Sequence, residues 1–597
     1  MIGRRSIHDS RTIHCTQGAH RLTLFNVTQA RRIASGFFPD PTICEKPEGG
    51  YLMVNSSFEF FPGLPVWESE DGEHWGLIGY AMDRPEQFSY DSMGNSQGIY
   101  APTLRWHDGT YYLIVTNVNR GNMILTTRDP HAGWSDPIWV DGWPGIDPSL
   151  FFDDDGTAYI CGNEGSSGEE KPGIYLAAID PDRGRVLTER VHICGGITGS
   201  NPEGPHLYKR RGMYYLMWAE GGTESGHMEN IARSSAPFGP YEMYPGNPML
   251  TNRSTHLTLQ AIGHCDCAHI EDDRTLMVFH GTRNNDEYPA QGWIGREPYA
   301  VWFEWGEDGW PHLSDQSYDT PLEGDGSAAE RNVSWITPGI DADHRYWVMA
   351  PPHRHHEEAD VALPPQDDGA GAPNGPVEGG QESHLAQSDG ATAPNGPVAG
   401  PQVDQTAQSD DAAASDGPDG PEGPLPATIT VDAIEQDFSL QAGPPLIGTR
   451  QTCFTCCFTA TVADTGQLAM GEAGIAAYAN ADHYITVAFR AAEHGVCQVE
   501  ASVHNADLVS VVGRVQALAA HPLTLVLEGD ARGYACSLIE HPFPDGGFEA
   551  NEPVVHDLGR IPGKVLSFSN AGGFTGTLLG VYAHGAGAVT FTDVTYA

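Results

Sequence analysis

Residues 203–223 read EGPHLYKRRGMYYLMWAEGGT, which is one strand, a tight turn and a second strand rich in aromatic residues. The turn at Arg211–Gly212 carries a glycine, and the run that follows it is almost entirely apolar. This pattern is typical of a β-hairpin whose second strand is buried. Glu203 stands at the start of the hairpin between a proline and a glycine, which is an unusual place to bury a carboxylate.

The hairpin belongs to an internal repeat. Similar turn-and-strand stretches recur about every 50–60 residues, and a fixed period of this size is typical of repeat architectures. Five antiparallel sheets at this spacing predict a five-bladed β-propeller. The five stretches are GGYLMVNSS (49–57), DGTYYLIVTN (108–117), DGTAYICGN (155–163), RGMYYLMWAE (211–220) and DDRTLMVFHG (272–281).

One position upstream of each repeat is distinctive. It lies 11 or 12 residues before the apolar strand and is occupied by Asp40, Tyr100, Asp147, Glu203 and His264. Four of these five side chains are ionisable. Because the first strand of each propeller blade lines the central channel, equivalent positions should point at one axis. The alternative is that the five residues lie on exposed turns, but the shared register favours a single site.

Three carboxylates in one aromatic-lined channel indicate glycoside hydrolysis. An inverting glycosidase uses one protonated acid and one ionised base, about 6.5–9.5 Å apart, on opposite faces of the sugar. A third carboxylate near the acid would raise its pKa by repulsion between like charges and keep it protonated near neutral pH.

Several words in the first half of the chain resemble glycoside hydrolase family 43, and most of all its branch of β-xylosidases and α-L-arabinofuranosidases. The resemblance runs from about residue 30 to residue 315. Its words are GFFPDPT (36–42), SFEFFPGLPVW (57–67), GIYAPTLRWHDGTYYL (98–113), GIDPSLFFDDDGTAY (145–159), EGPHLYKRRGMYYLMWAEGGT (203–223), GHMENIARS (226–234) and IGREPY (294–299).

The resemblance implies a role for each catalytic carboxylate. Asp40 matches the general base, Asp147 matches the carboxylate that orients the acid and tunes its pKa, and Glu203 matches the general acid. Arg296 matches an arginine that binds sugar hydroxyls in the family. The bond cleavage itself would need no cofactor.

The resemblance also implies a set of flanking residues. Phe58, Tyr100 and Thr223 fall in words that border the subsite for the terminal sugar, although many relatives carry Trp where Tyr100 stands. His264 matches a central histidine that lies beside a calcium ion in many relatives. We therefore expect a structural calcium near His264, with water completing a shell for which one imidazole supplies no oxygen.

The second half of the chain predicts a different domain. Residues 353–427 contain no Phe, Trp or Tyr, and such a composition predicts disorder. Short alternating strands then predict a β-sandwich of the jelly-roll type, which resembles the C-terminal concanavalin-like domain of the same branch. Its opening strand resembles HRYWVMAPP (344–352), so the disordered stretch would be an insertion within the sandwich. The HRHHEE cluster (353–358) is read as a solvated edge of that stretch.

The chain is therefore expected to be all-β, with a five-bladed propeller followed by a sandwich that carries a disordered insertion. The expected boundaries are an N-terminal extension (1–29), the propeller (30–318), a connection with the opening strand (319–352), the insertion (353–427) and the sandwich (428–597).

Bulk composition limits the partners. The 597 residues carry a net charge of −47, which argues against nucleic acid and anionic membranes and favours a neutral oligosaccharide. The oligomeric state stays open, a homo-oligomer included. The 11 cysteines form no disulfide framework, and the Cys453/Cys456 pair lacks a second pair at zinc spacing. Reduced thiols and the lack of an apolar run after the basic start lead us to expect a cytoplasmic protein.

The predicted function is an exo-acting, inverting glycosidase that releases terminal α-L-arabinofuranosyl or β-D-xylosyl residues from plant oligosaccharides. An endo-arabinanase or exo-galactanase of the same family is the alternative reaction. A carbohydrate-binding propeller without activity and an interaction scaffold are the alternatives from other classes, but neither explains three carboxylates in one register.

Overall fold

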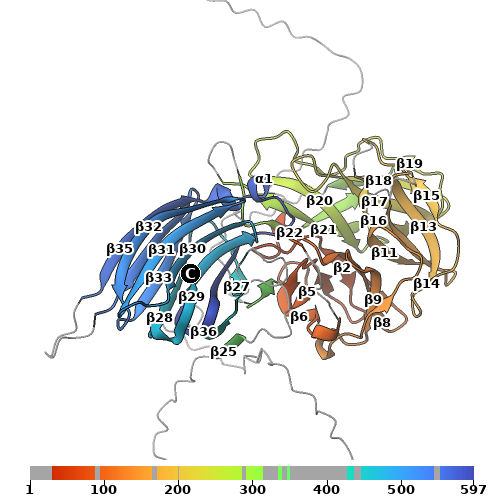
Figure 1. Ribbon diagram of the computed structural model, residues 1–597. Helices are drawn as coiled ribbons and strands as arrows, with labels where there is room; N and C mark the ends of the chain where they lie inside the picture. The colour runs from red at the N-terminus through yellow and green to blue at the C-terminus, as the bar shows by residue number, and fades with distance from the viewer. Residues whose placement is uncertain are drawn as a thin grey trace, which may run out of the picture.

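The computed structural model describes residues 30–87, 94–164, 171–198, 201–285, 291–313, 334–338, 346–349, 427–435, 438, 445–542 and 552–597. Figure 1 shows two all-β units side by side, a propeller in red to green and a sandwich in cyan to blue. The predicted fold class is confirmed: five antiparallel sheets form the propeller and one large sheet forms the sandwich. No helix among the described residues is long and apolar enough to cross a membrane.

Each propeller blade is an antiparallel sheet whose strands follow the chain from the channel outward. Blade I is β2 (Thr42–Glu45), β3 (Tyr51–Val54), β5 (Gly63–Ser69) and β6 (Gly76–Met82); blade II is β7 (Ile99–His107), β8 (Thr110–Asn117), β9 (Gly121–Thr127) and β10 (Ile138–Trp139). Blade III is β11 (Ile146–Phe152), β12 (Ala158–Glu164), β13 (Gly173–Asp180), β14 (Arg185–Val186) and β15 (Val191–Cys194). Blade IV is β16 (Glu203–Arg210), β17 (Met213–Glu220), β18 (Met228–Ser234) and β19 (Glu242–Met243).

Blade V joins the two ends of the propeller sequence. It contains β20 (Leu259–Ala268), β21 (Arg274–Arg283), β22 (Arg296–Trp305) and β23 (Pro311–Leu313), and the short β1 (Arg31–Arg32) pairs with β22. In this pairing Arg31 lies opposite Ala300, and Arg32 lies opposite Tyr299. The N-terminal end of the propeller thus completes its last blade.

The inner strands are irregular where they carry the shared register position. Asp40, Asp147 and His264 have φ values of 53°, 51° and 55°, in the left-handed region that few non-glycine residues adopt. The pairing of β11, β16 and β20 with their neighbours shifts at the same places. A bulge changes the direction in which a side chain points. Here the bulges direct the side chains at the shared position away from the regular in-and-out alternation of the strand and toward the channel.

A buried ion pair ties opposite blades together inside the channel. Arg105 of β7 donates two hydrogen bonds to Asp266 of β20, from Nη1 at 2.8 Å and from Nη2 at 2.9 Å. Asp266 also accepts from Thr42 Oγ1 at 2.5 Å and from Tyr208 Oη at 2.6 Å. The charged pair is fully hydrogen-bonded, which is the condition under which buried charges are tolerated. This network links blades I, II, IV and V.

The sandwich is built around β36 (Leu578–Tyr596), a long strand that pairs with β26, β27, β28 and β29. Its other strands are β25 (Tyr346–Met349), β26 (Ala427–Ala433), β27 (Leu446–Arg450), β28 (Cys456–Val462), β29 (Leu468–Asn480), β30 (His483–Arg490), β31 (Val496–Asn505), β32 (Leu508–Leu518), β33 (Leu523–Asp530), β34 (Gly533–Glu540) and β35 (Val554–Pro562). A short helix α1 (Phe568–Ala571) precedes β36.

β24 (Thr337–Pro338) pairs with β4 (Phe60–Phe61), and the described 3₁₀ helices are η2 (Pro85–Gln87), η3 (Pro130–Ala132), η5 (Thr465–Gln467) and η6 (Gly563–Leu566).

β25 and β26 are antiparallel neighbours, so residues 350–426 connect two adjacent strands of the sandwich sheet. The predicted insertion and the HRHHEE cluster lie outside the described residues, apart from Ala427, which begins β26. The predicted N-terminal extension, 1–29, lies outside them as well. The described cysteines, which include Cys453 and Cys456, are free thiols.

The two domains share an apolar interface. Phe37 and Phe60 of the propeller pack in one cluster with Tyr478, Tyr484 and Leu578 of the sandwich. Arg450 lies over the rings of Phe37 and Phe38, with distances of 4.8 Å and 4.3 Å from its guanidinium carbon to the ring centroids. These contacts place the sandwich beside the start of β2, close to Asp40, the residue of blade I at the shared position.

Candidate active site

Three acidic side chains meet at the channel from three different blades. Asp40 lies just before β2, Asp147 is the second residue of β11, and Glu203 begins β16. The backbone N–H of Gly204 donates to Asp147 Oδ2 at 3.1 Å, so the segment that carries Glu203 is held against Asp147. The register drawn from the repeats therefore brings together residues that are far apart in the sequence.

Asp40 is the carboxylate held in its ionised form. It accepts hydrogen bonds from Arg296 Nη1 at 2.6 Å and from Ser56 Oγ at 2.6 Å. Burial alone would raise its pKa, but the charge of Arg296, together with His264, holds the pKa well below its usual range. An ionised carboxylate is what a general base requires.

Glu203 and Asp147 are shifted in the opposite direction. Burial, followed by the nearby charges of Asp147 and Asp40, raises the pKa of Glu203 to about 8. Glu203 as a whole is half-buried. Burial also raises the pKa of Asp147, with Asp40 adding to the shift and His264 opposing it. Glu203 is thus protonated at neutral pH, as a general acid must be.

His264 packs directly against the acid-bearing segment. A side chain on Gly204, whose φ is 56°, would place its Cβ only 3.0 Å from the His264 ring. Glycine at 204 is therefore required both by the backbone and by the close approach of the imidazole.

The side chains around His264 do not fit a calcium cage. Its Nδ1 lies 3.6 Å from Asp40 Oδ1, and that oxygen is already paired with Arg296. Calcium takes six to eight oxygen ligands, whereas the His264 ring and the neighbouring His280 ring offer nitrogen atoms. Among the described residues, no group of three or more His, Cys, Asp or Glu side chains could hold a metal ion.

The predicted sugar-binding residues surround the same carboxylates. Thr223 Oγ1 accepts from Arg296 Nη1 at 3.0 Å. The Phe58 ring lies 5.5 Å from the Arg296 guanidinium carbon and 5.1 Å from the Tyr100 ring. All eight residues singled out from the sequence therefore lie around one pocket, although Arg296 contacts Asp40 directly rather than only a sugar.

The sandwich contributes a residue that sequence reasoning did not find. The Phe574 carbonyl accepts from Arg296 Nε at 3.3 Å and Nη2 at 3.1 Å. Its ring lies 5.8 Å from Phe58 and 6.0 Å from Tyr100, between centroids. The loop before β36 thus completes the aromatic wall of a pocket whose carboxylates come from the propeller.

Two residues that support Asp40 were also missed. Ser56 follows the first repeat strand, and its hydroxyl bonds to Asp40. His280 ends the fifth repeat strand, DDRTLMVFHG, and its Nδ1 accepts the Asp40 backbone N–H at 3.1 Å. Burial lowers the pKa of His280 to about 3, so the ring is neutral and can accept this bond. Both Ser56 and His280 are polar residues in or directly after an apolar repeat strand, and this is the sequence signal by which they could have been found.

The arrangement combines an ionised carboxylate, a protonated acid and a third carboxylate in a pocket walled by aromatic rings. Such a pair can activate water on one side of a substrate and protonate a leaving group on the other.

Comparison with known proteins agrees with this geometry. Residues 30–311 match the model of glycosyl hydrolases family 43. Residues 426–597 match the beta xylosidase C-terminal concanavalin A-like domain. The two matches coincide with the described propeller and with most of the sandwich.

Among curated proteins, the chain is 42% identical over 306 residues to a non-reducing end alpha-L-arabinofuranosidase of Bacteroides ovatus, which covers 49% of this chain and 55% of the relative. It is 39% identical over 292 residues to a xylosidase/arabinosidase of Butyrivibrio fibrisolvens, covering 47% and 55%. The matched part therefore spans about half the length of these relatives.

Solved structures match over nearly the whole chain. Bacteroides ovatus xyloglucan PUL GH43B has a TM-score of 0.70 at 27% identity and covers 95% of this chain and 98% of its own. Xylan beta-1,4-xylosidase from Bacillus halodurans has a TM-score of 0.71, with coverage of 95% and 99%; its 22% identity shows likeness of fold alone.

Proposed function

With its propeller and its sandwich both matching models of the family, the chain belongs to family 43 of the glycosyl hydrolases, and we propose that it is an exo-acting, inverting glycosidase. Its substrates are terminal α-L-arabinofuranosyl and β-D-xylosyl residues of plant oligosaccharides. The observation that carries the proposal is that Arg296 donates to Asp40 while Gly204 holds the Glu203 segment against Asp147, an arrangement that shifts the pKa values of Asp40 and Glu203 in opposite directions.

The proposed reaction is a single displacement. Asp40 accepts a proton from a water molecule as the water oxygen bonds to the anomeric carbon. The bond from that carbon to the leaving oxygen breaks, and Glu203 donates its proton to that oxygen. Asp147 orients the Glu203 segment through the Gly204 N–H, and its proximity helps to keep Glu203 protonated. The anomeric configuration is inverted because water attacks the face opposite the leaving group.

An exo mode of action is supported by the aromatic rings that gather on one side of the site. Phe58, Tyr100 and the sandwich residue Phe574 form one aromatic wall beside Arg296. A wall of this kind suits a terminal sugar better than the middle of a polymer. The names of the two curated relatives, one of them acting at the non-reducing end, support the same class of substrate. The aromatic wall favours an exo reaction over an endo-arabinanase, and the names of the relatives favour arabinose and xylose over the galactose that an exo-galactanase releases.

We also propose a cytoplasmic location and leave a homo-oligomer open. The free thiols of the described cysteines support a reducing compartment, because oxidising compartments favour disulfides.

Calcium near His264 is a prediction that rests on the resemblance alone. Because the surrounding side chains do not fit a calcium cage, water would have to supply most of the ligands. We therefore expect any bound ion to contribute little to activity or stability, and no catalytic step is assigned to it.

Replacing Glu203 with Gln should lower turnover of natural oligosaccharides by about 10²–10⁴-fold, which is the usual contribution of a general acid. Aryl glycosides with good leaving groups should be much less affected, because they need little protonation. In the parent enzyme, kcat/KM should fall as pH rises through about 8, where Glu203 loses its proton. Steady-state kinetics on both substrate types checks this; equal losses on both would contradict the acid assignment.

A panel of aryl glycosides tests the substrate class. We expect hydrolysis of aryl α-L-arabinofuranoside and aryl β-D-xylopyranoside, and release of monosaccharide alone from arabino- and xylo-oligosaccharides. The first-formed sugar should have the inverted anomeric configuration by NMR. Release of oligosaccharides from linear arabinan would instead indicate an endo-arabinanase.

Treatment with EDTA tests the metal prediction. Since the donor set around His264 does not fit calcium, we expect activity and melting temperature to stay unchanged after chelation and dialysis. A loss restored by Ca²⁺ but not by Mg²⁺ would establish a calcium requirement, and a His264→Gln variant should then lose the Ca²⁺ response.

A further inference from the structure

One face of the sandwich sheet is hollow beyond the part that the propeller covers. Tyr484 of β30 belongs to the interface cluster that includes Phe37 and Phe60. Next to this cluster, and sharing Phe438, Tyr484 and Ala488 with it, lies a cavity of about 260 Å³, just below the usual range for small-molecule sites. Its lining includes the small side chains of Thr486, Ala488 and Ser502.

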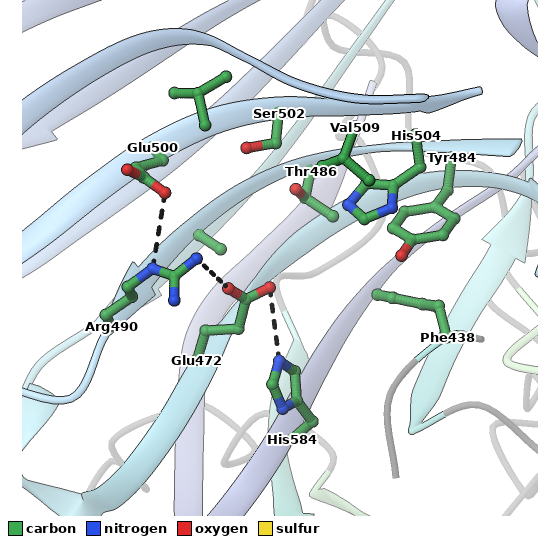
Figure 2. A pocket seen from close by; sticks show the side chains of 12 residues that line it. Phe438, Glu472, Tyr484, Thr486, Arg490, Glu500, Ser502, His504, Val509 and His584 are labelled. Atoms are coloured by element: carbon green, nitrogen blue, oxygen red, sulfur yellow. Dashed lines mark ion pairs between the residues drawn. The ribbon is translucent and has the colours of Figure 1, made fainter. Parts of the chain in front are cut away.

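The cavity has two chemically different ends. Figure 2 shows Phe438, Tyr484 and His504 at one end, and Glu472, Arg490, Glu500 and His584 at the other, with Thr486 and Ser502 between them. The His504 ring is stacked on the Tyr484 ring, with 4.0 Å between centroids and 18° between planes. Aromatic rings thus lie at the opposite end of the hollow from a set of hydrogen-bonding groups.

The charges at the polar end compensate one another. Arg490 lies between Glu472, at 3.4 Å, and Glu500, at 3.5 Å. Glu500 is also paired with Arg514, and Glu472 lies 3.6 Å from His584 Nε2. Because the acids and bases balance, the cavity offers no net charge to an anion or a cation. It does offer fixed acceptors and donors to a neutral ligand.

We propose that this cavity is a second, non-catalytic binding site for a neutral oligosaccharide. A sugar ring has an apolar C–H face that suits the aromatic end and hydroxyl groups that suit the carboxylates and guanidinium. That the sugars are pentoses rests on the proposed function; the existence of the site does not. The carboxylates here are paired, unlike Glu203, so the site binds without chemistry.

Affinity electrophoresis of the full chain tests the site. The Glu203→Gln variant serves as the parent, so that the polysaccharide in the gel is not consumed, and the probes are soluble unbranched xylan and anionic polygalacturonate. An unbranched polymer presents few chain ends to an exo-acting pocket, so retardation reports the cavity. We expect retardation by unbranched xylan only, abolished by Ser502→Trp, which fills the hollow, and by His504→Ala.

Ser510→Trp is the matched control, since it adds the same bulk to neighbouring β32 outside the cavity lining. It should migrate like the parent, and thermal melts should show all variants folded. Equal retardation of the parent and Ser502→Trp, or no retardation of the parent, would overturn the proposal. Failure of the proposed function would appear separately, as lack of hydrolysis by the unmodified chain.

A second inference concerns a buried carboxyl group at the domain interface. Glu59 accepts a hydrogen bond from the Ser96 backbone N–H at 3.2 Å through Oε1, and its Oε2 has no hydrogen-bond partner. Ser96 Oγ in turn accepts from the Phe574 N–H at 2.8 Å. A Cβ on Gly573 would lie 2.6 Å from Ser96 Oγ, so this contact is tightly packed.

The chain of contacts continues into the catalytic centre. The Phe574 carbonyl accepts from Arg296, and Arg296 donates to Asp40. The adjacent Asn95 is also fixed by the sandwich, because its Oδ1 accepts from the Ala481 N–H at 3.2 Å. An uninterrupted series of hydrogen bonds thus connects Glu59 to the proposed base.

We infer that Glu59 is a positioning residue for the proposed reaction, which fixes the Phe574 loop over the sugar pocket through Ser96. Burial raises the pKa of Glu59 to about 7. The titratable groups that face it are Tyr100 of β7 and Tyr478 of β29, which are neutral in this range and supply no positive charge. Ionisation would therefore leave a charge without a counterion at the interface and weaken the loop contact.

Hydrogen exchange and sugar binding as functions of pH test this role in the full-length Glu203→Gln protein. We expect protection of the 572–577 amides, and affinity for D-xylose or L-arabinose, to fall up to about tenfold between pH 6 and pH 8, as linkage to one proton requires. Glu59→Gln, which cannot ionise, should remove this pH dependence, and Glu59→Ala should lower protection at every pH.

Glu86→Gln, at an exposed site in η2, is the matched control and should keep the parent's pH dependence. Identical profiles of parent and Glu59→Gln would overturn the inference. Protection of the loop is measured without sugar, so it tests Glu59 even if the proposed function fails.

Discussion

Three carboxylates cannot all be ionised within one buried pocket, and the position of a single guanidinium decides which of them is. Arg296 contacts Asp40 directly, so the negative charge resides there. Asp147 and Glu203 lack an equally close cation, and the charge on Asp40 makes their own ionisation harder. The division into base and acid is thus a property of the whole cluster. Neither residue has its role by chemical type alone, since aspartate and glutamate differ little in solution.

This electrostatic arrangement explains several energetically unfavourable features of the fold. Asp40, Asp147 and His264 occupy backbone conformations that are unfavourable for residues with side chains, and such strain persists only where the surroundings enforce it. The surroundings here include the Arg105–Asp266 pair, which joins blades II and V. Close packing around Gly204 adds a further restraint. The channel is therefore held rigid by polar contacts as well as by the apolar layers between blades.

The propeller and the positions of its catalytic residues could be predicted because short sequence motifs repeat along the chain. A turn followed by an apolar strand identifies each blade, and the spacing to Asp40, Asp147 and Glu203 follows from that repeat. Phe574, Ser96 and Glu59 carry no such signal. The Phe574–Ser96 contact joins residues 478 positions apart and depends on how two domains dock. The Arg105–Asp266 pair carries no local signal either, because its residues lie 161 positions apart and meet only when the propeller closes. Bulged backbone at the register positions also follows from tertiary constraint rather than local propensity.

The pairing of β1 with β22 has a consequence for biosynthesis. Arg31 and Arg32 emerge from the ribosome long before Tyr299 and Ala300, their partners in blade V. Blades I to IV can form in order as the chain lengthens, but the ring stays open until the last blade is translated. Contacts of such long sequence separation are slow to form, and open sheet edges invite association with other chains. The first of the described strands is thus the last to be paired, and ring closure is the step at which a nascent chain would be most dependent on protection.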